Sequence, residues 1–132
     1  MFGTQGSAAS FPVLEPSTAV PVHHGATIVS EFPSIVHLNV GGQRLMTTLG
    51  TLRSDPESML GRMFSGEQPV LRDVDGCFVI DRDGRHFHYI LNYLRDGSVP
   101  IGISRVDRID LMREVDFYGL RSLYSLIGGS GP

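Results

Sequence analysis

Gly41 and Gly42 separate two runs of residues that favour β-strands, 35–40 and 43–48. In the first run every second residue is apolar, so one face of the strand is apolar and the other polar. A Gly-Gly pair between such runs is typical of a tight hairpin, because the turn needs positive φ angles. The sequence therefore predicts a β-hairpin. A phosphate-binding loop is excluded, because a helix should follow its glycines and a second strand follows these.

Four segments further along carry apolar residues at helical spacing, and each predicts an amphipathic helix. The stripes are Met59, Leu60, Met63 and Phe64; Phe87, Ile90, Leu91 and Leu94; Leu111, Met112, Val115 and Tyr118; and Leu120, Leu123, Tyr124 and Ile127. Gly66, Gly97 and Gly119 stand where the first three helices should end. Between the first two stripes, the apolar run 77–80 follows an Asp-Gly turn signal and predicts a short buried strand.

Polar residues ahead of the helices predict where they start. Asp55 is expected to cap the first helix. Asp81 and Asp83 precede the second, where carboxylates satisfy free amide groups and complement the helix dipole. Ser104-x-x-Asp107 resembles a capping box at the third helix, with Asp in the place of the usual Glu.

The order hairpin, helix, strand and three helices predicts an α+β domain over residues 34–128. We expect a small β-sheet, made from the N-terminal hairpin and one later strand, packed with four or five helices. Residues 1–33 contain four prolines, many Ser, Ala and Gly, and only two charged residues. That composition predicts a disordered leader. Residues 129–132 are expected to form a flexible tail.

Composition argues against several classes of function. Cys77 is the single cysteine, so neither an intrachain disulfide nor a Cys-rich zinc site can form. The formal net charge is −3 and there is no basic run, which argues against nucleic-acid binding. No apolar run approaches the ~18 residues of a membrane span. We expect no direct membrane insertion and a location in the cytoplasm, with the nucleus as an additional compartment.

Acidic residues and histidines are dense between residues 78 and 97, a pattern that could hold a metal ion. The segments 73–76 and 81–84 begin like calcium loops, but glycine comes too early and the closing bidentate Glu is missing. His86 and His88 are two residues apart on a helix, so their side chains diverge and cannot share an ion. Cys77 lies in an apolar run, which disfavours a reactive thiolate. We expect no enzyme, no cofactor and no metal site within one subunit, whereas a site shared between subunits stays open.

Helix caps do not account for all polar residues around the second helix. Arg82, Arg85, His88, Asn92 and Arg95 alternate with acidic residues there. Such alternation suits a polar interface between identical copies, in which Asp of one subunit meets Arg of the next.

Three segments in their order and spacing resemble a known family. These are "VHLNVGGQRLMTTLGTLRSDPESMLGRMFSG", "FVIDRDGRHFHYILNYLRDG" and "LMREVDFYGL". Together they are similar to the BTB/POZ-type tetramerisation domain of the potassium channel tetramerisation domain-containing (KCTD) proteins. The resemblance implies a ring of four or five subunits and an adaptor that brings a substrate protein to a Cullin-3 ubiquitin ligase. The alternatives are an assembly or auxiliary domain of a potassium channel or receptor complex, and a bare homo-oligomerisation module.

The resemblance and the charge pattern together supply candidate contact residues. Candidates for the subunit interface are Asn39, Arg44, Asp81, Arg82, Asp83, Arg85, Asn92 and Arg95. Candidates for contact with the cullin are Met63, Phe64, Phe117, Tyr118 and Tyr124, for which an ordinary core position is the alternative. All 11 basic residues are Arg, which fits an adaptor that avoids ubiquitination of itself and equally fits GC-rich coding.

Overall fold

The computed structural model describes residues 31–129, so the predicted leader up to residue 30 and the tail from residue 130 lie outside it. The strands are β2 (Ile35–Val40), β3 (Gln43–Thr48), β4 (Leu71–Arg72) and β5 (Phe78–Ile80). The helices are α1 (Leu49–Leu52), α2 (Met59–Met63), α3 (Phe87–Asp96), α4 (Arg105–Tyr118), α5 (Arg121–Tyr124) and the π-helical turn η1 (Ser125–Gly129). No helix in this described part is both long and apolar enough to cross a membrane.

The four strands form one mixed sheet in the order β3-β2-β5-β4. β2 and β3 are the predicted hairpin, with Val40 opposite Gln43. Gly41 and Gly42 occupy the turn at φ 59° and 97°, the positive values that a two-residue hairpin requires. β5 lies parallel to β2, with Leu38 opposite Phe78, and β4 closes the other edge in antiparallel fashion. The predicted α+β class with a small sheet is therefore confirmed, while β4 and α1 were not predicted.

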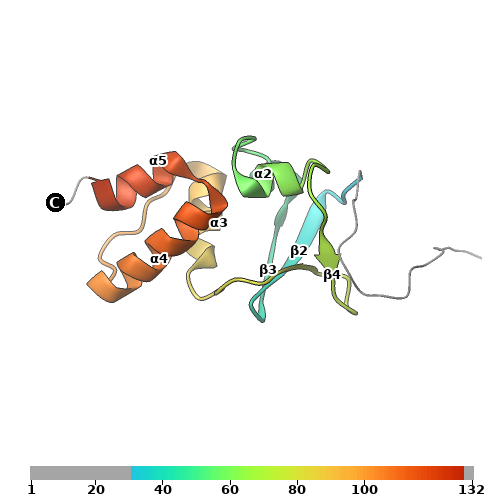
Figure 1. The fold of residues 1–132 in the computed structure, drawn as a ribbon, viewed down its shortest axis with the longest axis horizontal. Helices are drawn as coiled ribbons and strands as arrows, with labels where there is room; N and C mark the ends of the chain where they lie inside the picture. The colour runs from blue at the N-terminus through green and yellow to red at the C-terminus, as the bar shows by residue number, and fades with distance from the viewer. Residues whose placement is uncertain (1–30, 130–132) are drawn as a thin grey trace, which may run out of the picture.

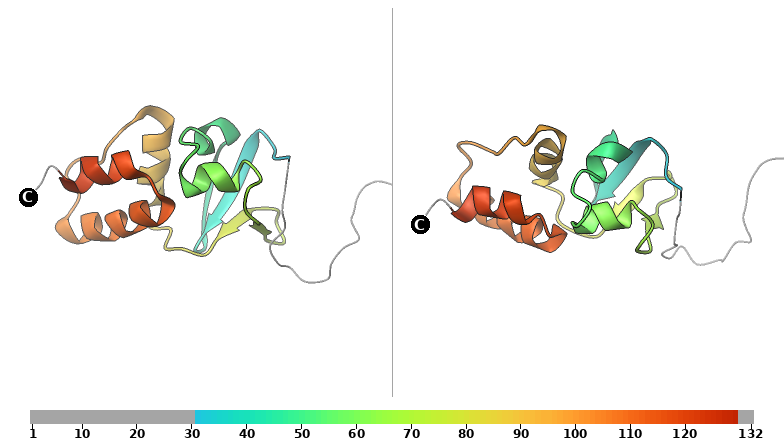
Figure 2. Two further views of the ribbon diagram at one scale, coloured as in Figure 1. Left: turned by 45° about the horizontal axis from the view of Figure 1, so that its top comes forward. Right: turned by 90° about the horizontal axis from the view of Figure 1, so that it is seen from above.

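Figures 1 and 2 show the sheet and α2 toward one end of the molecule and α3, α4 and α5 grouped toward the other. A single hydrophobic cluster connects the two ends. Its fully buried members include Leu38 and Phe78 from the sheet, Phe64 at the end of α2, and Ile90 and Tyr118 from the helical group. The cluster also extends to Phe32, whose ring lies 5.3 Å from that of Phe64 and 5.7 Å from that of Phe78.

The start of α2 differs from the prediction. Ser58, not Asp55, is the N-cap, and its Oγ accepts a hydrogen bond from the Gly61 amide at 3.0 Å. Asp55 instead accepts from the Glu57 amide at 3.2 Å, two residues on. This local turn competes with helix for the backbone, which is the usual behaviour of Asp next to a turn. The end is as predicted, because Gly66 has φ 85° and donates to the Met63 carbonyl at 3.3 Å.

The start of α3 also corrects a prediction. Its N-cap is His86, which makes no side-chain capping hydrogen bond. Asp83 accepts from the Arg85 amide at 3.0 Å and so forms a turn before the helix, not a cap. Asp81 is exposed and caps nothing. Gly97 ends the helix in the left-handed conformation, as predicted.

The last two predicted helices are present, with changes at their ends. Ser104 caps α4 by accepting from the Asp107 amide at 3.0 Å. The reciprocal half of the capping box is replaced, because the Asp107 carboxylate lies against His86. The final segment is α5 followed by the π-helical turn η1, not one α-helix.

Gly84 gives a test of how closely the backbone packs beside the hairpin. A Cβ on Gly84 would overlap the carbonyl oxygen of Val40. We expect Gly84→Ala to lower the free energy of unfolding by about 1–3 kcal/mol, the usual effect of overpacking. Gly50→Ala is the matched control, because nothing lies within 4 Å of its Cβ position. Urea denaturation of both variants measures the effect, and equal stability would show that the backbones can separate without cost.

Candidate interaction surfaces

The eight candidate interface residues do not form one patch. They divide into a group on the sheet, a group in the segment between β5 and α3, and a group at the C-terminal end of α3. Most of the charged candidates already have an ion-pair partner within the chain. Which residues remain free for another molecule therefore depends on the contacts within each group.

The sheet group contains Asn39 on β2 and Arg44 on β3. The Arg44 guanidinium donates to Asp75 at 2.6 Å, and both side chains are 56% exposed. Asn39 donates to Asp73 at 3.1 Å and accepts from the Gly42 amide at 2.8 Å. The hydrogen bond from Asn39 is the main cause that lowers the pKa of Asp73. The exposed Arg44–Asp75 pair contributes little to stability and is free to exchange partners.

Arg82 lies two residues after β5 and makes a bidentate contact with α4. Its guanidinium donates to both carboxylate oxygens of Glu114 on α4, at 2.9 and 3.2 Å. Glu114 is only 7% exposed, and the guanidinium carbon lies 3.9 Å from the centre of the Phe117 ring. Burial raises the pKa of the adjacent Tyr118 hydroxyl. Arg82 thus uses its charge within the chain and links the β5–α3 segment to α4.

Asp83 and Arg85 pair with each other in the same segment. The Arg85 guanidinium contacts both oxygens of Asp83, the shortest contact being 2.8 Å. Hydrogen bonds from the Arg85 side chain and then its backbone lower the pKa of Asp83 to about 2. Arg85 also donates to Asp110 on α4 at 3.2 Å, and Asp110 lies 3.4 Å from Arg113. These two candidates form a mostly exposed network directed at α4.

The remaining candidates are the most accessible. Arg95 donates to Asn92 at 3.3 Å and to the Met46 carbonyl at 3.1 Å, so it joins α3 to β3. Asn92 and Asp81 are both exposed. Within residues 31–129, Asp81 has no ion-pair partner. Asp81 is therefore the candidate whose charge is most available to a second chain.

Three of the five candidates for cullin contact are core residues. Phe64 and Tyr118 have no exposed surface, and Met63 is 8% exposed. Phe117 is half-buried beneath the Arg82 guanidinium. Tyr124 on α5 is 42% exposed and is the one candidate with a large accessible side chain. The alternative stated for these residues, an ordinary core position, therefore holds for Met63, Phe64 and Tyr118.

Tyr124 lies on the wall of a hollow of about 360 Å³ at the corner between α4 and α5. The hollow is lined by Val115, Asp116, Gly119, Leu120, Arg121, Tyr124 and Ser125. A second hollow continues from Gly119 and Arg121 to residues 55–57, ahead of α2. The surface around Tyr124 is thus concave and carries both an aromatic and a cationic side chain.

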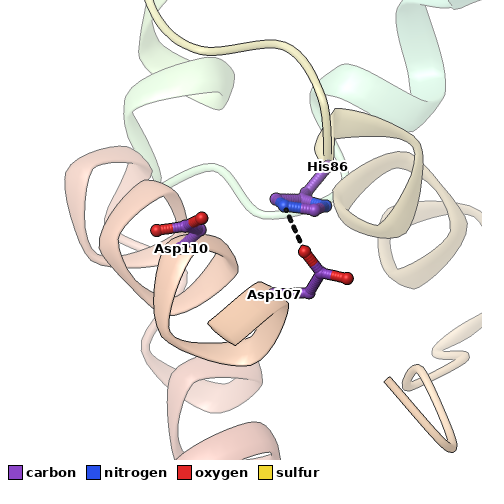
Figure 3. Close-up of side chains that lie close together, drawn as sticks. All are labelled: His86, Asp107 and Asp110. Carbon is purple, nitrogen blue, oxygen red and sulfur yellow. Dashed lines mark ion pairs between the residues drawn. The ribbon is translucent and has the colours of Figure 1, made fainter. Parts of the chain in front are cut away.

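Figure 3 shows a cluster that sequence reasoning missed: His86, before α3, faces Asp107 and Asp110 on α4. The His86 Nε2 lies 3.6 Å from an Asp107 oxygen, and the His86 side chain is 12% exposed. The two carboxylates share one face of α4 because they are three residues apart. Only that spacing was visible in the sequence, since nothing local connects His86 to a helix that starts about twenty residues later.

Glu114 continues the same face of α4, so Asp107, Asp110 and Glu114 form an acidic stripe. The segment 82–86 supplies the groups that face this stripe: the Arg82 guanidinium meets Glu114, the Arg85 guanidinium meets Asp110, and the His86 imidazole lies beside Asp107. The alternating charges that predicted an interface between copies therefore act, to a large extent, as an interface between two parts of one chain.

The Arg82–Glu114 contact gives a prediction for charge reversal. Arg82→Glu would place two carboxylates together, one of them buried. We expect it to lower the free energy of unfolding by roughly 3–5 kcal/mol, the effect of leaving a buried charge unpaired. Urea denaturation measures the stability of Arg82→Glu and of the double variant Arg82→Glu/Glu114→Arg, in which the two charges are exchanged. The exposed Arg105→Glu at the start of α4 is the control, and equal stability of the two single variants would contradict the contact.

Comparison with known proteins fits this architecture. The family model described as BTB/POZ domain matches residues 36–127. The chain is 46% identical over 96 residues to the FH protein interacting protein FIP2 of Arabidopsis thaliana, covering 71% of this chain and 32% of that protein. It is 48% identical over 88 residues to the BTB/POZ domain-containing protein KCTD21 of Mus musculus and of Homo sapiens, covering 67% of this chain and 34% of each relative. The chain thus spans about a third of the length of these relatives. It belongs to the BTB/POZ domain family, and within it to the KCTD group.

Proposed function

We propose that this chain is a non-enzymatic, homo-oligomerising adaptor domain that recruits a Cullin-3 ubiquitin ligase to a substrate protein. As a BTB/POZ domain it is a protein-interaction and self-association module. The observation that carries the finer proposal is the 48% identity to the KCTD21 relatives, which extends over most of the described domain. The resemblance to the KCTD group implies the ring of four or five subunits and the cullin partner, and an adaptor of this kind would work in the cytoplasm and the nucleus.

The exposed charges support self-association between copies. Asp81 has no ion-pair partner among residues 31–129, and the Arg44–Asp75 and Asp83–Arg85 pairs are partly exposed. Exposed pairs exchange partners at little cost, because water screens the attraction between their charges. A second copy could therefore bind through Asp81 and these pairs without disturbing the buried Arg82–Glu114 contact.

The hollow beside Tyr124 supports a separate cullin contact. Aromatic side chains next to a concave surface are the usual centres of binding energy in protein interfaces. Tyr124 meets both conditions, and it belongs to α5, a helix that lies away from the sheet (Figure 1). The hollow could thus receive a partner side chain while the charged residues contact neighbouring subunits.

The burial of Met63, Phe64 and Tyr118 favours a second candidate function. With those three residues in the core, the surface for a cullin is smaller than the sequence predicted. A domain that assembles a channel or receptor complex would need the self-association surface alone. This alternative shares the oligomer with the first proposal and differs from it only in the absence of a cullin contact.

Asp81 provides the test of self-association. We expect the purified chain to sediment as a tetramer or pentamer. Asp81→Arg should shift it toward smaller species, because like charges placed together at an interface cost several kcal/mol. Glu67→Arg, an exposed reversal in the loop after α2, is the control and should leave the mass unchanged. Sedimentation equilibrium measures both, and a parent chain that stays monomeric at high concentration would rule out the ring.

Tyr124 provides the test of cullin recruitment. We expect micromolar or tighter binding of the purified Cullin-3 N-terminal region, measured by titration calorimetry. Tyr124→Ala should weaken it by about tenfold or more, as for an interface aromatic that carries binding energy. Leu126→Ala is the control, because Leu126 is 52% exposed and does not line the hollow. No binding by the parent chain would favour the channel or receptor alternative, and equal affinities would place the contact elsewhere.

A further inference from the structure

We propose that His86, Asp107 and Asp110 form a binding site for a divalent transition-metal ion of the zinc class. One nitrogen and two carboxylate oxygens, one from each residue, lie within 4.8 Å of one another. An imidazole with two carboxylates is a ligand set that zinc accepts, and three protein ligands leave one position open for water. The proposal is independent of the proposed adaptor function.

The His86 imidazole carries a buried nitrogen that lacks a partner in the described residues. The Nε2 atom of His86 is inaccessible to solvent and has no hydrogen-bond partner in the described part of the chain. A buried nitrogen without a partner loses its hydration and gains nothing in return. A bound cation would satisfy this nitrogen directly, and the His86 ring lies beside Asp107 and Asp110 of α4 (Figure 3).

The distance between the His86 and Asp107 ligand atoms fits a metal ion better than a hydrogen bond. The His86 Nε2 and an Asp107 oxygen are 3.6 Å apart, which is too long for a good hydrogen bond. Zinc bonds of about 2.0–2.2 Å hold two ligand atoms roughly 3.4 Å apart across a tetrahedral ion. The observed separation is thus close to what one ion between the two groups requires. An Asp110 oxygen lies within 4.8 Å of the other two ligand atoms, and this side chain has to move toward the ion to complete the set.

Two arginines compete with a metal ion for Asp110, and both can release it. Asp110 is contacted by Arg85 at 3.2 Å and by Arg113 at 3.4 Å, so an ion must displace at least one of them. Arg85 keeps its shorter contacts with Asp83 when it releases Asp110. Arg113 is 60% exposed and returns to solvent at little cost. Asp107 is 48% exposed and has only His86 as an ion-pair partner in residues 31–129, so the ion can enter from its side.

The consequence would be a cross-link between the start of α3 and the start of α4. These helices otherwise meet through core contacts and through the exposed Arg85 network. An ion bound to both would hold the acidic stripe against the segment 82–86 more firmly than the 3.6 Å contact does. Metal occupancy would therefore raise the stability of the helical group.

The test is a zinc titration of the full chain by calorimetry, with visible absorption of bound Co²⁺ as a second measurement. His23→Gln and His24→Gln are introduced first, because these two adjacent histidines could bind metal themselves. We expect this parent to bind one Zn²⁺ per chain and to show a higher thermal midpoint with Zn²⁺ than without it.

Two variants and a matched control locate the ion. His86→Gln and Asp107→Asn should each weaken binding by at least about tenfold, since changes even beyond the ligands cost that much. Asp107→Asn retains the fold, because that side chain is half exposed. His88→Gln removes an exposed imidazole two residues away and should leave the affinity unchanged. Absence of saturable binding by the parent, or equal affinity of the parent and His86→Gln, would overturn the proposal.

Discussion

The contact between the hairpin turn and the segment after β5 is the constraint on which the rest of the structure depends. The Gly41 amide donates to the Ile80 carbonyl at 3.0 Å. A Cβ on Gly41 would overlap the Arg82 carbonyl oxygen, and one on Gly84 would overlap that of Val40. Two backbones can approach this closely only where both lack side chains. The parallel pairing of β2 with β5 places residue 81 beside the hairpin turn. Gly41 and Gly84 then determine the direction in which the chain continues from β5 toward α3.

That direction determines how the helices are attached. Once residues 82–86 leave the turn, Arg82, Arg85 and His86 face α4, where Glu114, Asp110 and Asp107 occupy one face. The three contacts differ in strength. The Arg82–Glu114 contact is bidentate and largely buried, the Arg85 contact is exposed, and the His86–Asp107 contact is long at 3.6 Å. The buried end fixes the position of α4, because an unpaired Glu114 would be costly. At the other end of the stripe, the His86 nitrogen lacks a hydrogen-bond partner among the described residues. This nitrogen is therefore the group of the stripe that can bind a ligand.

Local patterns predicted the parts of this fold that local forces determine. The Gly-Gly turn, the apolar stripe of α3, the Ser104 cap and the Gly97 ending all follow from neighbouring residues. Long-range contacts were not predictable, because nothing in the sequence says which carboxylate meets Arg82 across 32 positions. β4 was missed since two residues carry no periodicity, and its pairing with β5 is what makes it a strand. The candidate interface residues stay a prediction, and in the structure most of their charges make contacts within the chain.

Some charged residues are paired within the chain and others are exposed, and this difference bears on how copies could assemble. Arg82 cannot turn to another subunit without leaving Glu114 buried and alone, so its exchange would cost several kcal/mol. Arg44 and Asp75 are each 56% exposed, so their separation costs little because water screens the pair. An interface between copies should therefore recruit Asp81, Arg44 and Asp75 before it recruits Arg82. In such an assembly the exposed charges of the sheet and of the turn after β5 would determine specificity, whereas the buried Arg82–Glu114 pair contributes to the stability of each subunit.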